Sequence, residues 1–194
     1  MQEEIKLENL DIIQAIFWCL TYVFLLFYQL WKKEQIIPSL VVIQNLSWEF
    51  NSVLFSRFFN YALLFRFLWL MLDFAIFMTI LKMTIKASAL KQIRALLFLT
   101  VFFIPVFLYG DNLILAFVID TVIAFCWLLD LVRAKNSNAC LVFVGFSKFF
   151  GDYFAWLAYR SDSSFVYLIG YFVLILNVIF IGVSVYRLIS LRKS

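Results

Sequence analysis

Long, nearly uninterrupted apolar stretches make up most of the sequence, and this feature constrains the fold more than any other. A transmembrane helix needs about 20 predominantly apolar residues. Stretches of about this length lie near residues 12–31, 36–56, 61–81, 94–110, 112–132, 140–159 and 165–186. A membrane β-barrel would instead show short alternating strands with many turn residues, and the chain has only five Gly and two Pro. We therefore predict an all-α membrane protein, with one transmembrane domain over residues 1–194 and a bundle of seven transmembrane helices.

The composition leaves too little polar sequence to cover a soluble globule. Hydrophobic residues make up 65% of the 194 residues, whereas about half of a soluble domain is apolar. Lipids are therefore the expected partners of the outer surface. The chain has no His, and Cys19, Cys126 and Cys140 stand at no metal-like spacing. We expect these cysteines to pack as small apolar residues, and we expect no metal ion or other cofactor.

Lysine and arginine gather at alternate ends of the predicted helices, which indicates the orientation of the bundle. One side has these basic residues: Lys32, Lys33, Lys82, Lys86, Lys91, Arg94, Arg133, Lys135, Arg187, Arg192 and Lys193. The other side has fewer basic residues and more acidic ones: Lys6, Arg57, Arg160, Glu3, Glu4, Glu8, Asp11, Asp111 and Asp162. We predict an N-terminus outside and a C-terminus in the cytoplasm, in a bacterial inner (plasma) membrane or a eukaryotic endoplasmic reticulum. This asymmetry explains the net charge of +4 without a nucleic-acid partner.

Ionisable side chains inside the predicted spans are functional candidates, because each costs at least about 2.5 kcal/mol on insertion scales. They are Glu49, Arg66, Asp73, Asp120, Asp130, Lys148 and Asp152. Lys148 and Asp152 are one helical turn apart and can form an ion pair, so a structural and a functional role are equally open for them. Asp130 stands near the predicted cytoplasmic end, which favours a structural role. Arg66 and Asp73 share nearly one helix face and can belong to one network.

Glu49 differs from the others, because no basic residue lies within one helical turn of it along the chain. Asn45 comes one turn earlier on the same face, so we expect this polar face to point into the bundle. A buried carboxylic acid without a nearby cation should hold its proton at neutral pH, and it can then serve in acid catalysis. The structural alternative is a neutral Glu49 hydrogen-bonded to a neighbouring helix.

Aromatic side chains are the second unusual feature, with 25 Phe, nine Tyr and six Trp. Most of these rings should face lipid or the membrane interface. Rings that face inward can stabilise a carbocation through their negative faces. An aromatic cavity with one neutral acid suits the proton-initiated cyclisation of an isoprenoid, and it equally suits lipid binding or translocation of a substrate.

Three segments suggest a family. Residues 37–50 end in Asn-Leu-Ser-Trp-Glu-Phe, residues 68–74 read Leu-Trp-Leu-Met-Leu-Asp-Phe, and residues 146–151 read Phe-Ser-Lys-Phe-Phe-Gly. They resemble the second, the next and the sixth helices of the small seven-helix integral membrane terpene cyclases of the paxilline and pyripyropene type. Length, helix count and short loops are similar too, so the resemblance spans most of the chain and points to a bacterial or divergent member.

The resemblance implies a metal-independent cyclase that protonates the terminal epoxide or alkene of a prenylated small-molecule substrate. Glu49 matches the family's acid in the second helix. The family's second acid, an Asp in the last helix, aligns with Asn177, which cannot donate a proton with comparable acidity. Either Asp73 or Asp152 substitutes, or the substrate differs, or the protein is a non-catalytic relative. The candidate substrate-binding residues are Asn45, Trp48, Trp69, Lys148 and Asn177, and Asn45 and Asn177 are expected to orient Glu49.

The other interpretation is a non-enzymatic membrane protein: a small transporter, an oligomeric pore, or an accessory or defence effector. The intramembrane charges would then line a path or a subunit interface. Transporters with inverted repeats often have helices broken by Gly or Pro, and the two prolines here are Pro38 and Pro105. Pro38 opens a predicted helix, which counts mildly against transport. The sequence leaves the substrate and the oligomeric state open.

Overall fold

The computed structural model describes residues 2–32, 42, 45–46, 48–50, 53, 61–84, 113–133 and 139–191. These residues are helical apart from a turn at 160–163, and no strand occurs among them. The five long helices are α1 (Gln2–Lys32), α3 (Tyr61–Thr84), α5 (Leu113–Arg133), α6 (Ala139–Tyr159) and α7 (Ser164–Leu191).

Four of these helices contain stretches that are long and apolar enough to cross a membrane: Asn9–Lys32, Leu63–Ile80, Ala139–Tyr159 and Ser164–Ser190. Helix α5 adds a shorter apolar stretch, Ala116–Leu129. Large apolar side chains such as Phe27, Leu64 and Leu168 are more than half exposed on the outside of the bundle. A contiguous apolar surface is unusual for a soluble monomer and is suited to contact with lipid. The all-helical prediction is therefore confirmed, and several helices are fit to span a membrane.

The helix bounds agree with the predicted spans in the middle of the chain and differ at its ends. Predicted spans 61–81, 112–132 and 140–159 correspond to α3, α5 and α6 within a few residues. Helix α1 begins at Gln2 rather than near residue 12, and α7 continues to Leu191 rather than ending near 186. No Gly or Pro interrupts residues 2–11 or 183–191, so the helices extend beyond their most apolar stretches.

Two predicted spans are described in part or not at all. Within 36–56, the described residues 42, 45–46, 48–50 and 53 are helical. The span predicted at 94–110 lies outside the described residues. The predicted join after residue 159 is a turn, in which the backbone N–H of Asp162 donates to the carbonyl of Tyr159 at 3.0 Å. Ser163 then caps α7, because its hydroxyl accepts a hydrogen bond from the backbone N–H of Val166 at 3.1 Å.

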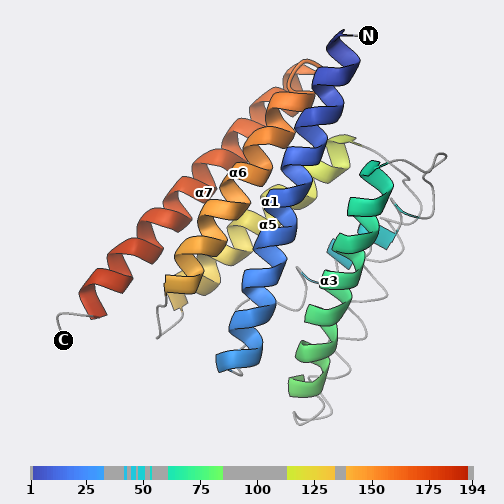
Figure 1. Ribbon diagram of the computed structural model, residues 1–194. Coiled ribbons are helices and arrows are strands. Elements are labelled where there is room, and N and C mark those ends of the chain that lie inside the picture. The colour runs from blue at the N-terminus through green and yellow to red at the C-terminus, as the bar shows by residue number, and fades with distance from the viewer. Residues whose placement is uncertain are drawn as a thin grey trace.

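Helix α1 is central among the described helices. It packs against α6 on one side and α3 on the other, α6 also packs against α7, and α7 packs against α5 (Figure 1). The first turns of α1 lie at the same end of the bundle as the α6–α7 turn (Figure 1). This end is called the turn end below.

Glycines let these helices approach closely. A Cβ at Gly145 would lie 2.9 Å from a side-chain atom of Ile181, and one at Gly151 would lie 2.8 Å from the Trp18 ring. Small residues at helix contacts are typical of membrane bundles, where close backbone approach favours association. The two glycines therefore fix the contacts of α6 with α7 and with α1.

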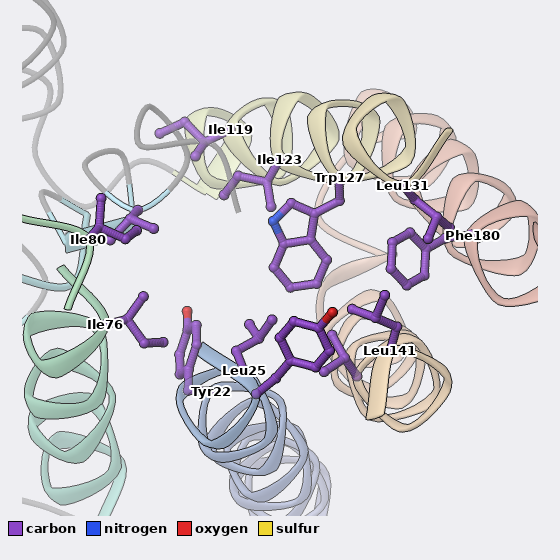
Figure 2. Packing of buried hydrophobic residues seen from close by; sticks show 13 residues of the cluster. Tyr22, Leu25, Ile76, Ile80, Ile119, Ile123, Trp127, Leu131, Leu141 and Phe180 are labelled. Carbon is purple, nitrogen blue, oxygen red and sulfur yellow. The ribbon is translucent and has the colours of Figure 1, made fainter. Parts of the chain in front are cut away.

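An apolar core fills the space between the helices. Figure 2 shows side chains of α1, α3, α5, α6 and α7 pointing toward a common centre, among them Leu25, Ile76, Trp127, Leu141 and Phe180. Tyr22, Ile119 and Ile123 belong to this core and also line the cavity described next. The core therefore closes the inner part of that cavity.

Candidate functional site

A cavity of about 380 Å³ lies between α1, α3, α5 and α6. The α1 side chains that line it stand three or four residues apart on one helix face: Asp11, Gln14, Ala15, Trp18 and Tyr22. At a rise of about 1.5 Å per residue, this face spans about 16 Å. Tyr159 and Asp162 also line the cavity and lie at the turn end. The cavity therefore extends from the turn end into the bundle.

Glu49 lies in this cavity and is 3% exposed. The hydroxyl of Tyr22 donates a hydrogen bond to Glu49 Oε1 at 2.9 Å, and the side-chain amide of Asn45 donates to the same hydroxyl at 3.1 Å. We call these three residues the Tyr22 cluster. Because Oε1 accepts a hydrogen bond from the tyrosine hydroxyl, a neutral Glu49 would hold its own proton on Oε2.

Asp73 is a second buried carboxyl group near the Tyr22 cluster, 1% exposed on α3. It is close enough to Glu49 and Tyr22 to interact with both electrostatically. Its Oδ2 atom has no hydrogen-bond partner within the described part of the chain. Asp73 is not among the described residues that line the cavity.

A second polar cluster lies between α5, α6 and α7. Lys148 is 1% exposed, and its Nζ atom lies 2.7 Å from Asp120 Oδ1 and 2.5 Å from Asp152 Oδ2. Asn177 on α7 donates a hydrogen bond from Nδ2 to the same Asp152 oxygen at 2.6 Å. We call these four residues the Lys148 cluster. One ammonium group thus faces two carboxyl groups in the interior of the bundle.

Aromatic rings complete the surroundings of Lys148. Its Nζ atom lies 4.7 Å from the centre of the Trp18 ring and 5.7 Å from that of Trp127. These distances are within the range of cation–π attraction, which is strongest where the cation is shielded from water. Trp18 lines the cavity, so one ring borders both the buried ammonium and the open space.

No family model matches the chain, and no curated protein or solved structure matches it. The resemblance to the membrane terpene cyclases therefore stays a prediction based on the three segments quoted above.

Most of the residues that the sequence singled out lie together. The cavity is lined by Asn45, Trp48, Glu49, Trp69 and Asp152. The indole N–H of Trp69 donates to the carbonyl of Ala15 at 3.0 Å, which joins α3 to α1 beside the cavity. Lys148 pairs with Asp152, as their spacing predicts. Asp73, Lys148 and Asn177 are not among the lining residues, but each interacts with a residue that is.

Asn177 is a correction to the predicted site. We predict from the sequence that Asn45 and Asn177 orient Glu49, but the Asn177 amide binds Asp152. The reason is that α7 packs against α5 and α6. Asn177 is therefore linked to the cavity through its hydrogen bond to Asp152 on α6. Asn45 donates to the Tyr22 hydroxyl, which in turn donates to Glu49. Arg66 lines the cavity, and the side chain of Asp130 lies outside the described part.

Tyr22, Trp18 and the role of Asp120 were missed. Asp120 ranks among the intramembrane charges in the sequence, but its partner Lys148 is 28 residues away on another helix. Trp18 and Tyr22 look like ordinary lipid-facing aromatics when taken singly. A usable signal was present in α1, because Asp11, Gln14, Trp18 and Tyr22 form a polar and aromatic stripe at helical spacing.

Proposed function

We propose that this protein is an integral membrane isoprenoid cyclase in which Glu49 starts the reaction by protonating a prenyl chain. One observation supports this most: Glu49 accepts a hydrogen bond from Tyr22 and lines an aromatic cavity inside an apolar helix bundle. The volume of about 380 Å³ falls in the range of roughly 300–1,000 Å³ typical of small-molecule sites.

The walls suit an uncharged prenyl chain at most positions. Trp18, Trp48, Phe65, Trp69 and Phe117 line the cavity and provide flat apolar surfaces. Their negative faces also favour a positive charge that forms on the chain during cyclisation. The apolar core closes the inner part of the cavity, which would limit the access of water to the cation.

The proposed reaction begins at Glu49. Its carboxyl proton forms a bond to the terminal alkene carbon, or to the epoxide oxygen as the C–O bond breaks, and a carbocation remains on the chain. The next double bond attacks this cation and closes a ring. Tyr22 donates to Oε1 and therefore stabilises the carboxylate that Glu49 becomes. The final cation loses a proton to a carboxylate, for which Asp152 is the candidate in the cavity. Return of that proton to Glu49 completes the cycle.

The membrane arrangement that goes with this proposal has seven spans, an N-terminus outside and a C-terminus in the cytoplasm. The alternation of basic residues along the sequence supports it. In this arrangement the turn end of the cavity, with Asp11 and Asp162, faces the outside, and the substrate reaches the cavity from the outer leaflet.

The test compares membranes that contain the wild type, Glu49→Gln or Tyr22→Phe. Farnesyl- and geranylgeranyl-bearing substrates, linear and epoxidised, are supplied, and cyclic products are measured by mass spectrometry. We expect Glu49→Gln to lower turnover at least about 100-fold, because positioned general acids contribute roughly 10²–10⁴-fold. Tyr22→Phe should give an intermediate loss.

Tyr186→Phe is the matched control, since Tyr186 is 73% exposed on α7. It should have the activity of the wild type. A wild type that cyclises none of these substrates, or a fully active Glu49→Gln variant, would show that the proposed function is wrong.

A further inference from the structure

We propose that the cavity has a binding site for organic cations, formed by Trp18, Asp120 and Asp152, which we call the acidic wall. Its ligand would be a protonated alkylamine with an apolar tail. This inference does not rest on the cyclase proposal, because it concerns binding of a charged ligand without any reaction.

The first observation is the charge of the lining. Among the described residues that line the cavity, the acidic side chains are Asp11, Glu49, Asp120, Asp152 and Asp162. Among the same described lining residues, the basic side chain is that of Arg66. Lys148 offsets one charge of the acidic wall, and the proposed cyclisation uses Asp152 only as its final base. The remaining excess of acidic over basic side chains in the described lining favours a cationic ligand.

The second observation is an oxygen atom of Asp152. The side chain is 3% exposed, and its Oδ2 atom accepts from both Lys148 and Asn177. Its Oδ1 atom is buried and has no hydrogen-bond partner within the described part of the chain. Buried carboxylate oxygens normally have a donor. Asp152 lines the cavity, so a small turn of its carboxyl group toward the open space would let a ligand N–H group supply the missing donor.

The third observation is that this wall already binds an ammonium group. The Lys148 ammonium contacts Asp120 and Asp152 and lies over the Trp18 ring. Carboxylates with an aromatic face are a common arrangement for recognising ammonium groups. One lysine against two carboxylates leaves one negative charge, and a second ammonium on the cavity side would neutralise it.

The rest of the cavity fits the tail of such a ligand. Trp48, Phe65, Trp69 and Phe117 line it, and they offer apolar contact beyond the acidic wall. Since Oδ1 needs a hydrogen-bond donor, the site should prefer a protonated tertiary amine to a quaternary ammonium, which has no N–H group. It should bind a neutral compound of the same shape more weakly.

The experiment measures equilibrium binding to the purified full-length protein in phosphatidylcholine nanodiscs, after subtraction of binding to empty nanodiscs. The probes are N,N-dimethylphenethylamine, its quaternary trimethyl analogue, and the neutral carbon isostere isopentylbenzene. We expect saturable binding of the tertiary amine, binding of the quaternary analogue weaker by several-fold, and binding of the isostere weaker by at least about tenfold.

Variants locate the site. Asp152→Asn should weaken amine binding by at least about tenfold, because a charge-assisted hydrogen bond is lost. Trp18→Leu should weaken it several-fold, and Trp31→Leu, a tryptophan on the same helix that is 60% exposed, should leave it unchanged. Thermal melting of each variant checks that it is folded.

Three outcomes would overturn the proposal: no saturable amine binding by the wild type, equal binding of the amine and its isostere, or unchanged binding by a folded Trp18→Leu variant. The isostere comparison uses the wild type alone, so it decides the matter even if a variant does not fold. Cyclisation without amine binding would refute this site and leave the proposed function standing. Amine binding without cyclisation would support this site and refute the proposed function.

Discussion

Replacing Lys148 by Met tests the energetic role of the Lys148 cluster. The change keeps a long unbranched side chain and removes the ammonium group from Asp120 and Asp152, whose oxygens lie 2.7 and 2.5 Å from Nζ. Removing one partner of a buried ion pair costs about 3–5 kcal/mol, because a charge is left without compensation. Asp120 is 18% exposed and can regain some water, and Asp152 keeps its bond to Asn177. We therefore expect the free energy of unfolding to fall by about 3 kcal/mol, which is the lower end of this range.

The loss is measured as the free energy of unfolding in detergent micelles, from circular dichroism during titration with dodecyl sulfate. Lys32→Met is the matched control, because Lys32 is exposed at the end of α1. It should change stability by less than about 0.5 kcal/mol, as surface substitutions usually do.

The triple variant Lys148→Met/Asp120→Asn/Asp152→Asn gives the refuting comparison. Replacing a whole buried ionic group by well-packed hydrophobic side chains is often neutral for stability. The triple variant likewise leaves no uncompensated charge, so it should recover most of the lost stability. If Lys148→Met costs less than about 1 kcal/mol, or if the triple variant is no more stable than the single one, uncompensated charge is not what determines stability here.

Two further predictions concern packing and orientation. Gly151→Ala should lower the free energy of unfolding by about 1–3 kcal/mol in the same titration, because its Cβ would lie 2.8 Å from the Trp18 ring. Gly182→Ala should leave the free energy of unfolding unchanged, because a Cβ there has nothing within 4 Å. Equal losses in the two variants would contradict the close contact of α6 with α1. Green fluorescent protein fused to the C-terminus should fluoresce in intact bacteria, and alkaline phosphatase fused there should be inactive. The reverse pattern would contradict a cytoplasmic C-terminus.

Hydrophobicity made the described helices predictable, because a stretch of about 20 apolar residues has few other stable conformations in lipid. The pairing of Lys148 with Asp152 was predictable for a similar reason, since residues four apart share a helix face whatever the rest of the bundle does. The inward direction of Asn45 and Glu49 followed from the same periodicity.

Contacts between helices were not predictable in this way. Tyr22 and Glu49 are 27 residues apart, and Asp120 and Lys148 are 28 apart. These contacts depend on which helices pack together and on how each helix is rotated about its axis. A hydropathy pattern predicts neither of these. Asn177 shows the consequence: its residue type suggested a polar contact, but only the packing of α7 on α6 determined that its partner is Asp152.

This contact bears directly on the choice of the second acid in the proposed cyclase. If the proposed resemblance to the membrane terpene cyclases holds, the position aligned with Asn177 is an Asp in that family. Here the Asn177 amide lies 2.6 Å from a carboxylate oxygen of Asp152, so a carboxyl group stands one hydrogen bond away from the aligned position. Asp152 lines the cavity, whereas Asn177 and Asp73 are not among the described lining residues. In the proposed cyclase the second acid would therefore lie on α6 rather than on α7, and this arrangement favours Asp152 over Asp73 as the partner of Glu49.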